Sequence, residues 1–153
     1  MDTKYFEKIR IFDGGMGQEL LSKGLISKGT LWSASALIDK EFHKLVIDAH
    51  ISYINAGADI IVTNNFSARK IRFIQNKVVD KFQYANEQAG ILANKAKEIS
   101  KQNILIAGSL PSQSDTYVED ERSSSEIQSD FEEQAKIISP YVDFFYLDVV
   151  SSG

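Results

Sequence analysis

Asp59-Ile60-Ile61-Val62-Thr63 forms a nearly continuous apolar run, and the segments before and after it have the period of α-helices. A strand that is apolar along its whole length is typical of a parallel sheet covered on both faces. Three further short runs with strand-like composition lie at residues 9–12, 103–107 and 144–147. Because helical segments separate the four runs, the pattern predicts parallel β-α units and an α/β fold.

Three segments between these runs predict helices. The first begins at Asp39, a residue type that caps helices, and its stripe ends before Gly57. The third begins at Ser123-Ser124-Ser125-Glu126, whose spacing suits a capping box, and ends at Pro140. The apolar stripe of the first helix, which begins at Asp39, consists of Phe42, Leu45, Val46, Ala49, Tyr53 and Ile54. The second helix has an apolar stripe with strict three-four spacing, made of Phe82, Ala85, Ala89, Leu92, Ala96 and Ile99.

The order of these elements predicts part of a larger barrel. A complete (β/α)8 barrel, or TIM barrel, takes about 250 residues, and this chain has 153. The fourth run lies just before Ser151-Ser152-Gly153, with no helical segment after it. We therefore expect the N-terminal half of a TIM barrel, with about four strands and incomplete, in one domain; a small open α/β sheet is the alternative.

The composition excludes several classes of function. The chain has 17 Lys and Arg against 21 Asp and Glu, which argues against nucleic-acid binding by phosphate neutralisation. It contains no cysteine, which excludes a disulfide scaffold, a cysteine-based zinc site and a cysteine nucleophile within these residues. No stretch approaches the roughly 20 apolar residues of a membrane span, and the N-terminus lacks the apolar core of a signal peptide. We therefore expect a cytoplasmic protein that does not bind membranes.

Polar residues and glycines follow the predicted strands at their carboxyl ends, where α/β proteins bind ligands. The candidate binding residues at this rim are Asp13, Gly14, Gly15, Thr63, Asn64 and Asp148. Adjacent glycines let a ligand approach the backbone closely, and Asp13 would supply a negative charge suited to an ammonium or hydroxyl group. Two carboxylates from different strands indicate a site more strongly than either alone. A tight turn at Asp13 and helix capping by Thr63 and Asn64 are the structural alternatives.

Other residue types that often carry chemistry have a structural interpretation here. His43 and His50 share one helix face without an HExxH pattern, so we interpret them as packing or surface residues and not as metal ligands. Trp32 is interpreted as a packing residue, with a substrate-facing indole as the alternative. A basic cluster predicts a solvated face or an anion contact; it consists of Arg69, Lys70, Arg72, Lys77 and Lys81.

Several motifs follow one another in a fixed order along the chain. They are residues 11–20 (Ile-Phe-Asp-Gly-Gly-Met-Gly-Gln-Glu-Leu), Leu31-Trp32-Ser33-Ala34, His50 with Tyr53, residues 56–64 (Ala-Gly-Ala-Asp-Ile-Ile-Val-Thr-Asn) and Ala107-Gly108-Ser109-Leu110-Pro111. This ordered set resembles the N-terminal half of the homocysteine S-methyltransferases. Residues 1–153 would then form part of a homocysteine-binding domain.

The resemblance implies an enzyme that moves a methyl group onto the sulfur of homocysteine and produces methionine. The Leu31-Trp32-Ser33-Ala34 segment is most similar to cobalamin-independent members, which implies S-methylmethionine or S-adenosylmethionine as the methyl donor. In the family an aspartate after the first strand helps to hold the amino-acid end of homocysteine, and Asp13, with Gly14 and Gly15 beside it, occupies that place. The glutamate of the fourth strand corresponds to Asp148, which is one methylene shorter.

The resemblance also implies zinc, held by three cysteines in the second half of the family's barrel. Zinc lowers the pKa of the bound thiol, whose free value is about 8.5, so that a thiolate exists near neutral pH. These 153 residues contain no such ligands. We therefore expect no catalytic residue and no metal ligand in this chain, and no methyl transfer by these residues alone.

The first hypothesis is thus a part of a methyltransferase that is completed by a C-terminal half. The alternative is a non-catalytic half-barrel that associates with itself or binds a small amino acid. A barrel fragment that acts on a phosphorylated substrate ranks last, because no phosphate-binding loop is present.

Overall fold

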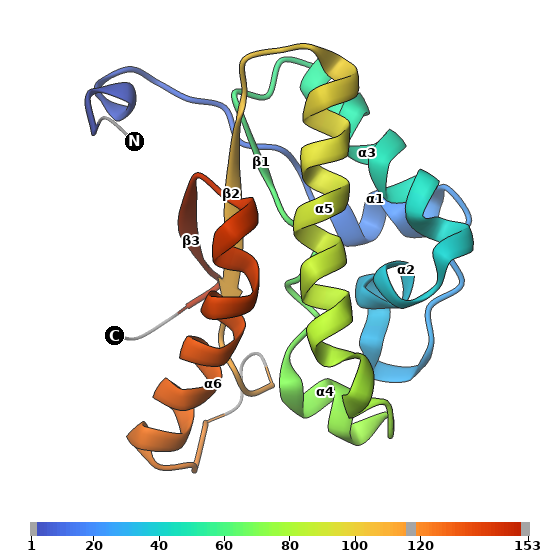
Figure 1. Ribbon diagram of the computed structural model, residues 1–153, viewed down its shortest axis with the longest axis vertical. Helices are drawn as coiled ribbons and strands as arrows, with labels where there is room; N and C mark the ends of the chain where they lie inside the picture. The colour runs from blue at the N-terminus through green and yellow to red at the C-terminus, as the bar shows by residue number, and fades with distance from the viewer. Residues whose placement is uncertain (1–2, 116–118, 151–153) are drawn as a thin grey trace.

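The computed structural model describes residues 3–115 and 119–150, and its centre is a parallel sheet with the strand order β1-β2-β3 (Figure 1). The strands are β1 (Ile60–Val62), β2 (Leu105–Pro111) and β3 (Phe144–Asp148). Ile61 pairs with Ile106, and Ala107 pairs with Phe144, both in parallel register. The predicted parallel α/β fold is therefore confirmed.

Helices connect the strands and lie along one face of the sheet (Figure 1). The α-helices are α1 (Met16–Ser22), α2 (Ser35–Ile38), α3 (His43–Asn55), α4 (Lys70–Gln75), α5 (Phe82–Ser100) and α6 (Ser124–Ile138). Short 3-10 turns are η1 (Thr3–Glu7), η2 (Gly29–Ala34), η3 (Lys40–Phe42), η4 (Val79–Lys81) and η5 (Ser139–Tyr141). The three predicted long helices are α3, α5 and α6.

Local signals place the ends of these helices as predicted. Asp39 caps η3, which runs directly into α3, and Gly57 follows α3 with a φ of +103°. Ser123 and Glu126 form the expected capping box of α6. The stripe of α5 is buried except for Ile99, where the prediction is wrong because this residue lies in the last turn, beyond the helix–sheet contact.

The predicted strand at residues 9–12 is wrong in extent. Only Phe12 forms a parallel bridge, and its partner is Ile60 of β1. Within the described residues nothing pairs with the outer edge of this segment, and Ile9 is 94% exposed. A strand forms by pairing and by covering an apolar face, and this segment has one neighbour and little cover.

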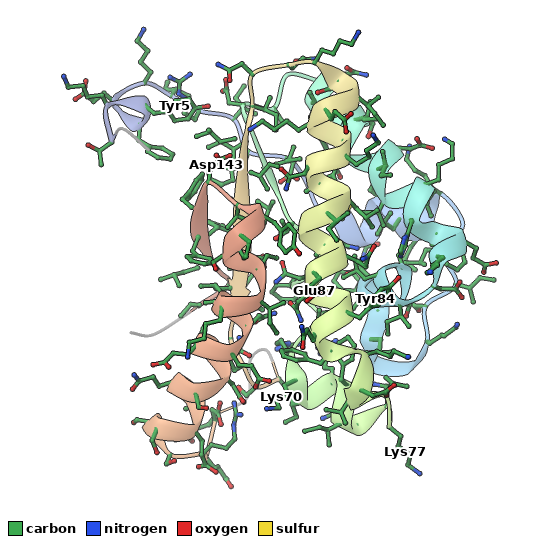
Figure 2. All side chains as sticks on the ribbon, viewed as in Figure 1. Tyr5, Lys70, Lys77, Tyr84, Glu87 and Asp143 are labelled. Atoms are coloured by element: carbon green, nitrogen blue, oxygen red, sulfur yellow. The ribbon has the colours of Figure 1, made fainter. Side chains whose placement is uncertain are left out.

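Two aspartates join neighbouring strands in the same way. The N–H of Asp59 donates to the carbonyl of Ile11 (2.8 Å), and its carboxylate accepts the N–H of the same residue (2.9 Å). Asp143, labelled in Figure 2, makes the same pair of bonds with Ile106, both at 2.8 Å. Asp59 directly precedes β1, and Asp143 directly precedes β3. The bonds of Asp59 therefore hold the segment 9–13 against β1, and those of Asp143 hold β2 against β3.

The third run extends further than predicted. The predicted run ends at residue 107, but β2 continues through Pro111. A Cβ on Gly108 would lie 3.1 Å from the Phe145 ring and 3.2 Å from Val142, so the glycine lets β3 pack closely against β2. The glycine here serves strand packing and not a turn.

The core lies between the sheet and the helices. Ile61 and Ile106 pack against Ile54 of α3 and against Ala93 and Ala96 of α5. Small residues on α5 allow this helix to approach the sheet closely, and a second, larger cluster fills the space among the helices.

Exposed apolar side chains concentrate at the two edges of the sheet. In the described part of the chain, 14 large hydrophobic residues are exposed, and nine of them fall within residues 6–12 and 145–150. We call these two segments the sheet edges. Leu147 of β3 is 64% exposed, and no strand among the described residues lies beyond β3. Apolar surface of this kind usually marks an interaction site.

Candidate functional site

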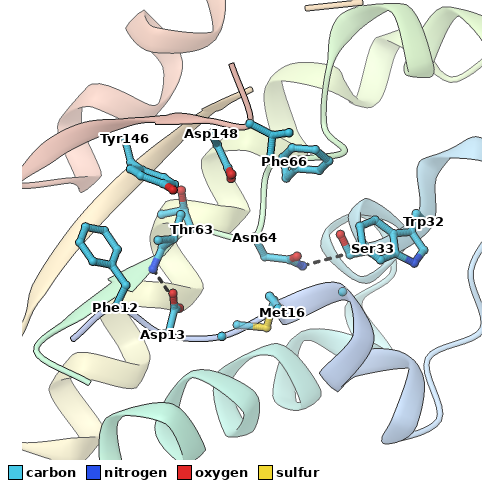
Figure 3. Close-up of a pocket in the computed structure, with 15 residues that line it drawn as sticks. Phe12, Asp13, Met16, Trp32, Ser33, Thr63, Asn64, Phe66, Tyr146 and Asp148 are labelled. Atoms are coloured by element: carbon cyan, nitrogen blue, oxygen red, sulfur yellow. Dashed lines mark hydrogen bonds between the residues drawn. The ribbon is translucent and has the colours of Figure 1, made fainter. Parts of the chain in front are cut away.

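A pocket of about 600 Å³ lies at the carboxyl ends of the strands (Figure 3). Its lining consists of Phe12, Asp13, Gly14, Gly15, Met16, Gly17, Trp32, Ser33, Val62, Thr63, Asn64, Phe66, Tyr146, Asp148 and Val149. All six residues predicted from the sequence are among them. The structure thus brings together predicted residues that are up to 135 positions apart in the chain (Asp13 and Asp148).

Asp13 is held in the floor of the pocket with only 3% of its side chain exposed. Its backbone N–H donates to the carbonyl of Ile60, and its Oδ2 accepts the N–H of Val62, both at 2.9 Å. Burial raises the pKa of Asp13 to about 7; the Val62 hydrogen bond lowers it, and the negative charge of Asp148 raises it further. A carboxyl in this state changes its charge readily when a cation enters.

Asp148 reaches the same pocket from the end of β3. Its Oδ2 accepts a hydrogen bond from the Ser109 hydroxyl of β2, at 2.8 Å. Burial raises the pKa of Asp148, and the bond from Ser109 lowers it. The two acidic groups therefore stand at one cavity, where they disfavour each other's charge.

Thr63 and Asn64 line the pocket, but they also have structural partners. The Thr63 hydroxyl donates to Oδ1 of Asn65 (2.6 Å) and accepts the N–H of Ser109 (3.0 Å). The carboxamide of Asn64 donates to the carbonyl of Ser33, at 3.2 Å. No hydrogen bond to Oδ1 of Asn64 exists within the described residues, so this oxygen is left as an acceptor for a ligand.

Behind these residues, a buried network of carboxamides fixes the loop after β1. The Asn65 amide donates to Oδ1 of Asn86 (3.1 Å) and to the carbonyl of Ser109 (3.0 Å). Gln134 of α6 donates to the same Asn86 oxygen, and Gln113 donates to Gln134 at 2.8 Å. Because the network joins β1, α5, β2 and α6, the pocket rim is held from four elements at once.

Two glycines in the segment 13–17 make room for aromatic rings. A Cβ on Gly17 would lie 2.4 Å from the Trp32 indole, and one on Gly14 would lie 2.9 Å from the Tyr53 ring. At Gly15 a Cβ would meet nothing within 4 Å. Gly17 is therefore required by the position of Trp32, whereas Gly15 leaves the backbone open toward the pocket.

Trp32 forms part of the pocket wall, and its indole also packs against Gly17. Its backbone has φ 46° and ψ −122°, a rare conformation for a bulky residue. Strained backbone persists where the surrounding structure enforces it, and such residues gather at functional sites. Val149, the neighbour of Asp148, also has a positive φ of 55°.

The sequence pattern does not predict which apolar residues together form the pocket wall. Phe12 and Tyr146 contact each other with ring centroids 5.3 Å apart. Met16 and Phe66 lie further along the wall (Figure 3). Strand alternation gave a signal for Tyr146, because a residue two positions before Asp148 faces the same side of the sheet. Phe66 and Met16 lie in loops and at a helix start, where no periodicity indicates a direction.

The predicted basic cluster does not form one solvated face. Arg69 is buried, and its guanidinium donates to the carbonyls of Ser112 and Ser114. Lys70 pairs with Glu133 at 2.5 Å, and Lys77 extends away from the body of the chain (Figure 2). Only part of the cluster is therefore exposed, and Arg69 serves to hold the chain after β2.

The donor groups of the described residues do not suit a metal ion. No three of their His, Asp and Glu side chains come together in a group that could hold one, and the sequence contains no cysteine. Asp13, Asp148 and the neighbouring His50 do not form such a group, and the sequence contains no sulfur ligand of the cysteine type that zinc often takes. A zinc ion does not fit the residues present. No helix within residues 3–115 and 119–150 is long and apolar enough to cross a membrane.

A parallel α/β chain whose strands end at one pocket, with two carboxylates and an aromatic wall, is typical of proteins that bind a polar small molecule. The family model described as homocysteine S-methyltransferase matches residues 10–152. The chain therefore belongs to the homocysteine S-methyltransferase family, as its motifs predict.

Curated relatives align with shorter segments. Homocysteine S-methyltransferase 2 of Zea mays is 32% identical over 90 residues, which cover 59% of this chain and 24% of the relative. Homocysteine S-methyltransferase of Escherichia coli is 31% identical over 67 residues, which cover 44% of this chain and 21% of the relative. The aligned segments thus span less than a quarter of either relative.

The fold also resembles a solved structure over nearly its whole length. The metallated form of the homocysteine methyltransferase MmuM from Escherichia coli superposes with a TM-score of 0.80 at 24% sequence identity. The superposition covers 97% of this chain and 57% of that chain. The likeness shows that the two share a fold, of which this chain spans rather more than half.

Proposed function

We propose that this chain supplies the homocysteine-binding part of a methyltransferase that converts homocysteine to methionine. The observation that carries the proposal is the meeting of Asp13, Asp148 and the Gly14-Gly15 backbone at one pocket. Family membership supports homocysteine as the substrate, and the ordered motifs support residues 1–153 as the N-terminal half of a TIM barrel.

The chemistry of the pocket suits an amino acid with an apolar, sulfur-containing side chain. Asp13 and Asp148 attract the α-ammonium group by charge, and the N–H groups of Gly14 and Gly15, which have no acceptor in the described residues, suit the α-carboxylate. The sulfur end then lies toward the aromatic wall, where Trp32 and Met16 exclude water. Thr63 and Asn64 complete the polar side.

The chemical step requires groups that these residues do not contain. Zinc, if held by cysteines of a further segment, would make the homocysteine thiol a nucleophile; here the chain's own residues bind and orient the amino acid. We therefore propose that residues 1–153 alone bind homocysteine and do not methylate it. S-methylmethionine or S-adenosylmethionine is the proposed donor, and the cytoplasm is the proposed compartment.

The sheet edges support a completing partner. Residues 6–12 and 145–150 expose apolar side chains and leave strand edges unpaired within the described chain. A C-terminal half of the same family, either continuous with this chain or separate, would cover both edges and close the barrel.

Calorimetric titration of the full chain with homocysteine tests the binding role. We expect wild type to bind, Asp13→Asn to weaken the affinity at least about tenfold, and norleucine, which keeps the amino-acid end, to compete. Asp48→Asn is the matched control, because Asp48 lies on α3 in an exposed ion pair with Lys44. If Asp13→Asn binds as tightly as wild type and Asp48→Asn, the proposed site is not where homocysteine binds.

A non-catalytic half-barrel that self-associates is a second candidate, and the same sheet edges favour it. Two copies related by a two-fold axis would each cover the other's edges. Sedimentation velocity distinguishes the candidates: a stable dimer that binds homocysteine and ignores an added C-terminal half supports the second. A monomer that forms a 1:1 complex with that half supports the first.

A further inference from the structure

His50 lies on α3 with its side chain fully buried, yet neither ring nitrogen has a hydrogen-bond partner within the described residues. A neutral imidazole always carries one N–H, and buried donors are normally satisfied. Burial lowers the pKa of His50 to about 4, so the ring is neutral near pH 7. Packing explains the burial of the ring but not its two unpartnered nitrogens.

The Asp13 carboxyl lies directly beside this ring. Nδ1 of His50 is 4.0 Å from Oδ2 of Asp13, the oxygen that accepts the N–H of Val62 at 2.9 Å. The separation is too long for a hydrogen bond, and forming one requires the two groups to approach by about 1 Å. Because both side chains are almost completely buried, bulk water does not compete for either group.

The other titratable groups near Asp13 are acidic. Asp148 on β3 disfavours a negative charge on Asp13. Tyr53, one turn after His50 on α3, has its pKa raised by burial and by the negative charges of Glu19 on α1 and of Asp13. A raised pKa keeps the O–H on Tyr53, so Tyr53 is a donor as well. His50 is favoured because it is fully buried and its Nδ1 lies 4.0 Å from Oδ2 of Asp13 without a hydrogen-bond partner.

We propose that His50 is a positioning residue for Asp13. When an ammonium group enters the pocket and the Asp13 carboxyl ionises, the Nδ1–H of His50 donates to Oδ2 and fixes the carboxylate with Oδ1 toward the ligand. The proton leaves Asp13 for solvent, and His50 stays neutral throughout. The identity of the ligand rests on the proposed function, whereas the pairing is a property of the empty chain.

NMR titration of the full chain without ligand tests the pairing directly. The carboxyl carbon of Asp13 and the ring nitrogens of His50 are followed while Asp13 ionises. We expect both to report the same midpoint, with His50 remaining singly protonated. His50→Phe removes the donor and should raise the midpoint of Asp13 by roughly one pH unit, a tenfold fall in its ionisation constant.

Two variants make the test specific. In His50→Asn the carboxamide nitrogen lies near the place of Nδ1, so it should restore most of the wild-type midpoint, which a purely structural role would not require. His43→Phe is the control, because His43 lies on the same helix and bonds the carbonyl of Leu37 at 3.0 Å. If His50→Phe leaves the Asp13 midpoint unchanged, or if His50 becomes doubly protonated in the titration, the inference is overturned.

Asp13→Asn covers the case in which His50→Phe fails to fold. In this variant the step in the His50 nitrogen signals should disappear, and a step that persists overturns the pairing. A second experiment measures homocysteine affinity at a pH above the Asp13 midpoint. There His50→Phe should weaken binding about tenfold relative to wild type, and His50→Asn should not. If His50→Phe binds homocysteine as tightly as wild type, the positioning role is overturned. If wild type binds no homocysteine while the coupled titration remains, the proposed function fails and the pairing stands.

Discussion

At the scale of single residues, Asp13 is the group on which the site depends most. Burial raises the pKa of this carboxyl to about 7, and it lies beside an imidazole that burial keeps neutral. A buried pair without net charge avoids the desolvation penalty of an ion pair. A cationic ligand supplies the charge that makes ionisation of Asp13 favourable.

The raised pKa of Asp13 predicts a particular pH dependence of stability. The folded chain binds the Asp13 proton more tightly than the unfolded chain, so ionisation destabilises the fold as pH rises from about 4 to about 7. Asp13→Asn removes this effect, and its free energy of unfolding relative to wild type should rise by about 1.4 kcal/mol per pH unit in that interval. Urea denaturation at several pH values measures the difference in unfolding free energy between Asp13→Asn and wild type. If this difference does not vary with pH, the raised pKa of Asp13 is contradicted.

The contribution of His50 to the pH dependence of stability has the opposite sign. Its folded pKa is depressed, so it stabilises the fold above about pH 6.5 and this stability is lost as pH falls toward about 4. The two slopes oppose each other between these values. The stability of wild type should therefore vary less over this interval than that of Asp13→Asn.

Gly17 and Gly15 provide a matched pair for the aromatic wall. Gly17→Ala places a Cβ 2.4 Å from Trp32, so the indole must move, and we expect a loss of about 1–3 kcal/mol in stability. Gly15→Ala meets nothing within 4 Å at a negative φ and should change stability by less than about 1 kcal/mol. Because Trp32 is the chain's only tryptophan, its fluorescence should shift in Gly17→Ala alone. Equal spectra for both variants would show that Gly17 does not set the position of the indole.

At the scale of elements, helices were easier to predict than strands. The capping box at Ser123 and the stripe of α5 are local patterns, and local patterns decide where a helix begins and which face it buries. The segment 9–12 has strand-like composition, but its pairing depends on neighbours distant in sequence. For the same reason the extension of β2 through Gly108 was missed, since it depends on contact with Val142 and Phe145.

The paired bonds of Asp59 and Asp143 predict a contribution of these residues to strand association. Asp59→Ala and Asp143→Ala each remove an acceptor for a backbone N–H and should lower the unfolding free energy by about 1–2 kcal/mol. Asp48→Ala removes an exposed ion pair with Lys44 and should cost no more than about 0.5 kcal/mol. Chemical denaturation compares the three variants. Losses as small for Asp59→Ala and Asp143→Ala as for Asp48→Ala would mean that the repeated bonds do not hold the strands.

At the scale of the whole molecule, the sequence predicted where the site lies better than how its wall is built. Asp13, Thr63 and Asp148 were found because carboxyl ends of parallel strands meet at one edge, a rule that needs only strand positions. The orientation of Trp32 depends on a rare backbone conformation, which no residue pattern predicts. The pairing of His50 with Asp13 also needed three-dimensional contacts.

The exposed sheet edges predict association. Ile9→Lys and Leu147→Lys place charges on these edges and should weaken association of the chain, with an added C-terminal half or with itself, as sedimentation velocity measures. Ile99→Lys, at an exposed position on α5, is the control and should not change the distribution. If all three variants associate as wild type does, the edges are not the contact surface.

We propose above all that these residues bind homocysteine but depend on a further segment for thiol activation. The most direct test is a methyl-transfer assay of purified residues 1–153 with zinc, homocysteine and S-methylmethionine, with and without a C-terminal half from a relative. We expect no methionine above the rate without protein for the chain alone, and turnover when the second half is added. Turnover by the chain alone at a rate comparable to a full-length relative would contradict the proposal.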